Sequence, residues 1–306
     1  MNQGEGAICS GALSLLMVSG RIAMKAENPH IGVTGTIALL HIPISICHPY
    51  HHPDYSPEYF FVFTWFHNHY VSSDPEHSHM GDVLDDPRLR ERRFVFSDRH
   101  DAGRQLGTFI KKFSAVSDPV VLAIPAGGVP VGREVAMALN APLSLAIVRK
   151  IRIPGSTEAG FGAVTWDGQV LINDGLRKAL GLSAAEVEAA VADTRKNVNE
   201  RIARFAGGRA VPALAGKTVI LADDGLASGF TMLAAVKSVR VHKPARIIVA
   251  VPTGSASSAE LVSHGVDQLV CLNIRTGRLF AVAEAYKQWY DLSDREVLEE
   301  LTGSMV

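Results

Sequence analysis

VILADDGLASGFTM, residues 219–232, carries the clearest structural signal in the sequence. Its apolar start is typical of a buried parallel strand, and it runs directly into two acidic residues, Asp223 and Asp224. Gly225 and Gly229 permit a tight turn after the strand, and a helical apolar pattern follows. A strand, a glycine-containing loop and a helix in this order are typical of open parallel sheets with helices on both faces.

The same alternation of apolar runs and amphipathic segments extends over the chain after Met80. Strands are predicted at residues 119–125, 142–150, 217–224, 245–252 and 268–274. Helices are predicted at residues 97–113, 131–139, 183–205, 231–241 and 255–264. Ser183 and Glu186 form a capping box, and Asp167-Gly168 marks a hairpin turn. The pattern predicts an α/β fold with a doubly wound, mostly parallel sheet flanked by helices.

Residues 1–79 differ from the rest of the chain. They lack a helical or strand period and hold nine of the twelve histidines. A zinc, copper or nickel site is one interpretation. We favour an irregular, poorly ordered extension, or sequence upstream of a native start at Met80, because no cysteine pair supports the histidine cluster. We therefore divide the chain into an extension, 1–79, and a globular domain, 80–306.

Composition excludes several classes of partner. The net charge of −1 gives no sign of binding to nucleic acid or to an anionic membrane. Three cysteines, Cys9, Cys47 and Cys271, lie far apart and predict neither a disulfide framework nor a zinc knuckle. The first ten residues lack the basic segment of a secretory signal. The apolar run 31–47 is shorter than the roughly 20 residues of a spanning helix. We expect a cytoplasmic protein.

The loop after the strand 217–224 predicts a site for a sugar phosphate. Backbone N–H groups at the start of the next helix form an anion site, and the Ser228 and Thr231 hydroxyls add donors. Asp223 and Asp224 can accept hydrogen bonds from vicinal ribose hydroxyls. The alternative is that these acids form only a turn after the strand. The candidate ribose and 5′-phosphate residues are Asp223, Asp224, Gly225, Leu226, Ala227, Ser228, Gly229, Phe230 and Thr231.

Two further strand ends carry unusual residues. Gly127 and Gly128 precede a helix and offer exposed amides, unless they serve only for close packing. Arg149, Lys150 and Arg152 are predicted to gather at the end of the strand 142–150, where they can neutralise a phosphate; the alternative is solvated surface charge. Ligands of doubly wound sheets bind at the carboxyl ends of the strands, which favours a functional interpretation of both sets.

The stretch VILADDGLASGFTM resembles the signature of type I phosphoribosyltransferases, which bind 5-phosphoribosyl 1-pyrophosphate (PRPP). Residues 94–301, with AGGVPV, VRK, a Gly/Pro-rich loop and DDGLASGFTM, are similar to a predicted phosphoribosyltransferase subfamily. The resemblance implies the type I fold with a small hood. It also implies transfer of phosphoribose from PRPP to a nitrogenous base or related amine, with release of pyrophosphate, in nucleotide salvage.

The same resemblance implies the roles of site residues. Pyrophosphate would bind at Ala126, Gly127, Gly128, Arg149 and Lys150. The catalytic residues would be Asp223, Asp224 and Lys150. Mg²⁺ would bind mainly through PRPP, so that no dedicated protein site for a metal is needed. A homodimer is left open.

Three positions depart from the family pattern. Ala126 stands where many members have a basic residue, and Ser228 and Phe230 stand where threonine and alanine are commoner. The first departure leaves a non-catalytic PRPP- or nucleotide-binding regulator as an alternative. The acceptor stays unidentified. Candidates for its pocket are residues 90–100 and four aromatic residues near the C-terminus, which are more often core residues. These aromatic residues are Phe280, Tyr286, Trp289 and Tyr290.

Overall fold

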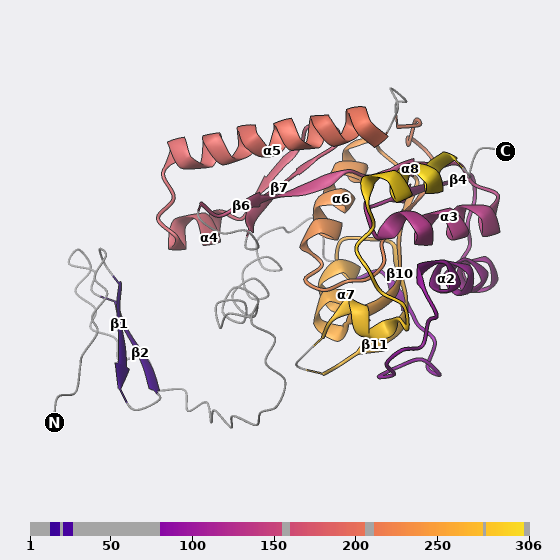
Figure 1. The fold of residues 1–306 in the computed structure, drawn as a ribbon, viewed down its shortest axis with the longest axis horizontal. Coiled ribbons are helices and arrows are strands. Elements are labelled where there is room, and N and C mark those ends of the chain that lie inside the picture. Colours follow the sequence, from indigo (N-terminus) through magenta and orange to yellow (C-terminus); the bar gives the residue numbers. More distant parts are fainter. Residues whose placement is uncertain are drawn as a thin grey trace. The chain divides into compact units, whose positions relative to one another are not determined.

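A computed structural model gives the fold (Figure 1). It describes residues 13–18, 21–26, 80–154, 160–205, 211–277 and 280–302. Within the first 79 residues, β1 (Leu13–Val18) and β2 (Arg21–Ala26) pair as an antiparallel hairpin that the sequence pattern did not predict. The histidines of this segment lie outside the described residues, and so does the metal site suggested for them. The division of the chain at residues 79 and 80 stays a prediction.

A six-stranded sheet forms the centre of the remaining chain, with the strand order β3-β11-β10-β9-β4-β5. Every neighbouring pair in it is parallel. Its strands are β3 (Asp82–Leu84), β4 (Pro119–Ala123), β5 (Leu143–Leu145), β9 (Thr218–Ala222), β10 (Arg246–Ser255) and β11 (Gln268–Arg275). The predicted parallel sheet is confirmed. The short strand β3 was not predicted, because its three residues are too few to show a period.

Helices cover both faces of this sheet (Figure 1). They are α2 (Arg99–Phe113) and α3 (Gly128–Leu139) on one face, and α6 (Phe230–Val241) and α7 (Ala256–Ser263) on the other. The fully buried strand β9 contacts the helices on both faces of the sheet. Val219 and Leu221 pack with the side chains of α6 and α7, while Ile220 and Ala222 pack with those of α2 and α3. Burial on both faces explains the unbroken apolar run at this strand.

The chain leaves the middle of the sheet in opposite directions at two neighbouring strands. After β4 it runs through α3 to β5, while after β9 it runs through α6 to β10 and the far strands. The two strands pair directly, with Ala123 opposite Ala222 at their carboxyl ends. The loops that follow β4 and β9 therefore begin next to each other and lead in opposite directions along the sheet. Such a switch point is where ligands bind in doubly wound sheets.

A second, antiparallel sheet contains β6 (Val148–Arg152), β7 (Gly160–Thr165) and β8 (Val170–Ile172). The long helix α5 (Ala184–Phe205) packs on it (Figure 1), and α6 contacts the same strands. The hairpin predicted at Asp167-Gly168 is confirmed as the β7–β8 turn.

The prediction of one strand over residues 142–150 was wrong. The chain leaves the main sheet after β5 and enters the small sheet at β6. Ala146, Ile147 and Val148, which make this transition, are as buried as the strand residues around them. Apolar character therefore continues through the change of sheet and hides it in the sequence.

Several helix starts agree with their sequence signals. Asp98 caps α2 by accepting a hydrogen bond from the Asp101 N–H at 2.8 Å. The Ser183 N–H donates to the Glu186 carboxylate at 2.9 Å and the Glu186 N–H donates to the Ser183 hydroxyl at 3.3 Å, which confirms the capping box of α5. The sequence did not predict α4 (Asp174–Ala179), the 3₁₀ turn η2 (Val282–Ala285) and α8 (Asp294–Thr302). Among the described residues, no helix combines the length and the apolar character needed to cross a membrane.

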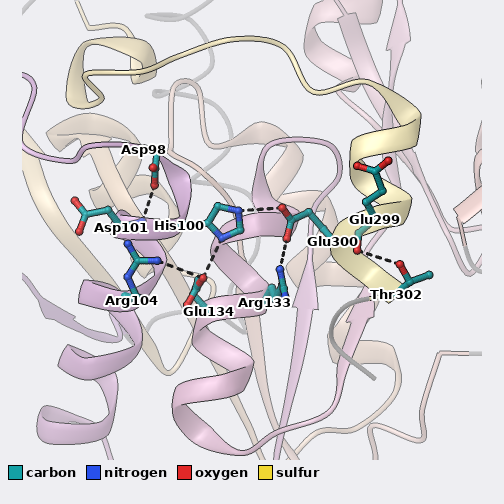
Figure 2. A network of polar contacts seen from close by, with 9 residues as sticks. All are labelled: Asp98, His100, Asp101, Arg104, Arg133, Glu134, Glu299, Glu300 and Thr302. Atoms are coloured by element: carbon teal, nitrogen blue, oxygen red, sulfur yellow. Dashed lines mark hydrogen bonds and ion pairs between the residues drawn. The ribbon is translucent and has the colours of Figure 1, made fainter. Parts of the chain in front are cut away.

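A polar network holds the C-terminal helix α8 against α2 and α3 (Figure 2). The two ring nitrogens of His100 on α2 lie 2.9 Å from Glu134 of α3 and 2.9 Å from Glu300 of α8. Arg133 of α3 donates to the second oxygen of Glu300 at 2.9 Å. On its other side α8 contacts α5, so this helix links the small sheet and its covering helix to the main sheet.

Candidate functional site

Two acidic side chains lie at the carboxyl end of β9, where the sequence predicted them. The Asp223 carboxylate accepts a hydrogen bond from the Asp224 N–H at 2.8 Å. The Asp224 carboxylate accepts one from Arg99 Nε at 2.9 Å, and these two side chains are only 16% and 8% exposed. Arg99 is the first residue of α2, 125 positions away. The sequence analysis missed it, because no local pattern links it to the loop.

This environment resists a full negative charge on both acids. Burial raises the pKa of Asp223 well above the usual carboxyl range, and the neighbouring Asp224 charge raises it further. Burial also raises the pKa of Asp224, while Arg99 opposes that rise. Two carboxylates thus share one guanidinium partner. A ligand that brings hydroxyl donors or positive charge would offset the excess negative charge of the two carboxylates.

The loop after β4 touches the acids directly. A Cβ atom at Gly127 would lie 1.8 Å from Asp224 Oδ2, and one at Gly128 would lie 2.8 Å from the Ala222 carbonyl oxygen. A side chain at Gly127 would displace the Asp224 carboxylate, and one at Gly128 would force the two loops apart. Ala126 precedes them, and its carbonyl accepts a hydrogen bond from the Val129 N–H at 3.1 Å in the first turn of α3. The glycines and the acids, distant in the chain, form one continuous surface at the switch point.

The second half of the β9 loop leads into α6. Gly229 adopts φ +72°, a conformation that side-chain-bearing residues rarely adopt. The helix begins at Phe230, one residue before the predicted start, and the Phe230 side chain packs against the buried core beneath it. The first helical hydrogen bond runs from the Leu233 N–H to the Gly229 carbonyl, so the helix itself does not use the N–H groups that come earlier. Such groups are the donors of the anion site that the sequence predicts.

A buried hydroxyl orients one peptide of this loop. Ser258, in the first turn of α7, donates to the Ala227 carbonyl oxygen at 2.5 Å, and its side chain is fully buried. A trans peptide is planar, with its C=O and N–H on opposite sides. Holding the Ala227 carbonyl toward α7 therefore turns the Ser228 N–H away from that helix. This adds a fixed donor to those at the start of α6.

The three basic residues of the third predicted site do not lie at the end of a main-sheet strand. Arg149, Lys150 and Arg152 all belong to β6 in the small sheet, because the strand predicted at 142–150 is two strands. Burial lowers the pKa of Arg149, and the charge of Arg201 on α5 lowers it further. Lys150 is exposed and follows Arg149 on the strand. Neighbouring strand residues point to opposite faces, so these two cannot approach one ligand from the same face.

The two segments suggested for an acceptor pocket lie side by side. The Lys287 N–H donates to the Phe96 carbonyl at 2.8 Å, and Tyr286 pairs with Phe96 in a parallel bridge. Tyr286 is 1% exposed, and its hydroxyl donates to the Asp224 carbonyl oxygen at 2.6 Å. Trp289 lies under the Arg99 guanidinium, 3.9 Å from ring centre to Cζ. Tyr286 thus contacts the acidic loop directly, and Trp289 contacts it through Arg99.

Comparison with known proteins identifies the family of this chain. The sequence matches the family described as "Phosphoribosyl transferase domain" over residues 107–289. Two curated Mycobacterium tuberculosis proteins are each 37% identical to it over 204 residues: "Putative phosphoribosyl transferase MT0597" of strain CDC 1551 / Oshkosh and "Putative phosphoribosyl transferase Rv0571c" of strain ATCC 25618 / H37Rv. These alignments cover 67% of this chain and 46% of each relative, so the chain spans about half their length.

A solved structure is similar over most of the described fold. The crystal structure of TT1426 from Thermus thermophilus is 32% identical, with a TM-score of 0.59, and the match covers 69% of this chain and 99% of TT1426. The main sheet, the two loops at its switch point and the sequence match over 107–289 all point to one family. The chain belongs to the phosphoribosyl transferase domain family, a family of transferase enzymes.

Proposed function

We propose that this chain binds PRPP and transfers its 5-phosphoribosyl group to a nitrogenous base or a related amine, releasing pyrophosphate. One observation carries the proposal. Two partly buried carboxylates, a helix start preceded by a left-handed glycine, and a glycine loop that excludes side chains meet at one switch point. These parts suit a ribose, its 5′-phosphate and a pyrophosphate in that order.

Each part has a separate task in this reaction. Asp223 and Asp224 accept hydrogen bonds from the ribose hydroxyls, while the N–H groups of the loop and of α6 hold the 5′-phosphate. The amide of Gly127 faces the pyrophosphate. The exposed amide predicted at Gly128 was wrong, because Gly128 is buried and its N–H donates to the Ile124 carbonyl at 3.0 Å. The bond from ribose C1 to the pyrophosphate oxygen breaks with its electron pair staying on pyrophosphate, a bond from C1 to the acceptor nitrogen forms, and the proton of that nitrogen leaves to solvent. The two carboxylates favour the positive charge that develops on the ribose ring meanwhile.

Mg²⁺ fits this donor set. It prefers oxygen ligands and commonly binds through substrate phosphates together with one or two carboxylates. Asp223 and Asp224 are partly exposed carboxylates next to each other, and Arg99 pairs with Asp224, so a cation would offset the remaining negative charge. When bound with PRPP, the ion supplies positive charge to the leaving pyrophosphate. Among the described residues no cluster of three or more acidic, histidine or cysteine side chains is arranged for a metal.

The setting of the reaction belongs to the same proposal. We infer a cytoplasmic protein that acts in nucleotide salvage on a small-molecule base, without a nucleic-acid or membrane partner. The net charge of −1 and the three widely spaced cysteines support this inference. A homodimer stays open as its assembly.

A PRPP-binding regulator without turnover is the second candidate function. Ala126 favours it, because the pyrophosphate loop lacks a basic side chain there. Pyrophosphate release from Mg²⁺-PRPP, measured with a panel of purines, pyrimidines and other amines, separates the two functions. We expect release that depends on one class of acceptor. PRPP binding without release for any acceptor would favour the regulator instead.

Lys150 provides a prediction about turnover. Its exposed ammonium is expected to neutralise pyrophosphate as charge builds on the leaving oxygen. Lys150→Ala should lower kcat by about 10- to 100-fold while changing the affinity for PRPP much less. Steady-state kinetics combined with a binding titration measures both quantities. Lys111→Ala, which removes an exposed lysine from the far end of α2, is the control. An unaltered kcat in Lys150→Ala would remove this residue from the reaction.

A further inference from the structure

We propose that Arg99, clamped by residues 286–290, is a positioning residue that holds the Asp224 carboxylate in place for the ribose hydroxyls of PRPP. The inference rests on the function proposed above for the acidic loop. It adds a residue that lies outside the loop motifs, and it gives the C-terminal segment a task.

Arg99 is fixed on every side. Its Nε donates to Asp224 Oδ2 at 2.9 Å, and its Nη1 donates to the Tyr290 carbonyl oxygen at 2.8 Å. The Trp289 ring covers one face of the guanidinium at 3.9 Å. With 8% of its side chain exposed, Arg99 has little freedom to swing toward solvent. A guanidinium with this many constraints sets the direction of the carboxylate it binds.

The backbone that carries Arg99 is equally constrained. Directly before it, Asp98 caps α2, and the Ser97 carbonyl accepts a hydrogen bond from the Gln288 N–H at 2.9 Å. The segment 286–290 therefore holds both the start of α2 and the side chain that α2 begins with. Through the Tyr286 hydroxyl it also binds the Asp224 carbonyl at 2.6 Å. It contacts Asp224 once directly and once through Arg99.

Arg99 is the cationic partner of the Asp224 carboxylate. The titratable groups that face this carboxylate are Asp223, whose side chain hydrogen-bonds to it, and Arg99, which attracts it, while Tyr286 binds only its carbonyl. Oδ2 lies against Gly127, where there is no room for a side chain. Without Arg99 the carboxylate would either take up a proton or turn away from Asp223. Both changes remove an acceptor from the ribose.

Lysine and arginine are not equivalent in this role. An ammonium at position 99 would keep the positive charge beside Asp224. It lacks the planar fork that binds Asp224 and Tyr290 together while stacking on Trp289. The electrostatic and the geometric parts of the role can therefore be separated by two variants, Arg99→Met and Arg99→Lys.

The test is a titration of Mg²⁺-PRPP into the full chain by calorimetry at a series of pH values over which circular dichroism shows the chain to stay folded. We expect Arg99→Met to weaken binding by about 10-fold or more at neutral pH, as for loss of a charged hydrogen bond. In a plot of its PRPP affinity against pH, the loss of affinity on the acidic side should move to higher pH, because the pKa of Asp224 rises without the guanidinium. This part of the plot is called the acidic limb. Arg99→Lys should keep the limb near its wild-type position and recover only part of the affinity. A purely structural role would leave the position of the limb unchanged.

Two further variants complete the test. Arg104→Met removes another arginine of α2, whose partner Glu134 is 3.5 Å away and outside the site, and should bind PRPP as wild type does. If Arg99→Met does not fold, judged by circular dichroism and thermal melting, Arg99→Lys and Trp289→Leu decide. Trp289→Leu should weaken binding, since it removes the support of the guanidinium.

The outcomes separate two failures. No binding by the wild-type chain would overturn the proposed function and the inference with it. Wild-type binding together with unchanged affinity and an unchanged pH profile in Arg99→Met would overturn the inference alone. If only Arg99→Lys and Trp289→Leu fold, unchanged binding in both would overturn it equally.

Discussion

Gly127→Ala is expected to lower PRPP-dependent activity by about 100-fold or more, since displacement of a reacting group by about 1 Å can have an effect of that size. The added methyl carbon would lie 1.8 Å from Asp224 Oδ2 and 2.5 Å from its Cγ. Neither the carboxylate, fixed by Arg99, nor the main-chain loop can yield without moving part of the site. We therefore expect higher KM and lower kcat together, measured by pyrophosphate release with a responsive acceptor.

Gly265→Ala is the matched control. The nearest atoms to a Cβ at Gly265 lie 3.6 Å away, an ordinary van der Waals contact, and no positive φ constrains that residue. It lies near the C-terminal end of α7, away from both loops. Activity near the wild-type value is expected for this variant. Comparable activity in Gly127→Ala would show that the two loops do not meet as described.

Asp223→Asn should weaken PRPP binding and stabilise the fold at neutral pH. The asparagine oxygen can still accept the Asp224 N–H, but the charged acceptor for a ribose hydroxyl is lost, so affinity should fall by about 10- to 100-fold. The buried like charge beside Asp224 also disappears. An increase in Tm of a few degrees is expected, because about 1 kcal/mol shifts Tm by about 2–4 °C in a domain of this size. Such opposing effects are typical of functional sites.

The sign of the pH dependence follows from the raised pKa of Asp223. Between the unfolded and the folded pKa, the unfolded chain loses its proton more readily than the native chain does, so the native state loses stability as pH rises. The Tm difference between Asp223→Asn and wild type should be near zero at about pH 4 and grow toward neutral pH. Asp118→Asn, at an exposed ion pair with Lys217, is the control and should show little change. A wild-type Tm that exceeds that of Asp223→Asn at neutral pH would contradict the assigned charge repulsion.

Local sequence patterns predicted those parts of the fold that depend on neighbouring residues. A fully buried strand such as β9 needs an unbroken apolar run, and a strand followed by a helix needs a loop whose glycines tolerate the turn. These requirements placed Asp223, Asp224 and Gly229 correctly at the end of β9 and the start of α6. Gly127 and Gly128 were likewise placed beside a helix start.

Contacts between distant segments could not be predicted in this way. Nothing near Arg99 indicates a partner 125 residues later, since its neighbours show only a helix cap. The switch from β5 to β6 was hidden because residues on both sides of it are buried. The support given by Tyr286 and Trp289 depends on a pairing with residues 94–97 that no periodicity reports.

Calorimetric titration of PRPP in the presence of Mg²⁺ tests most directly whether the loop 223–231 binds phosphoribose. The wild-type chain should show saturable binding, and Asp224→Asn and Thr231→Ala should each bind about 10-fold more weakly or worse, because each removes a hydrogen bond that involves a charged group. Absence of binding by the wild-type chain, or wild-type affinity in both variants, would contradict the role assigned to this loop.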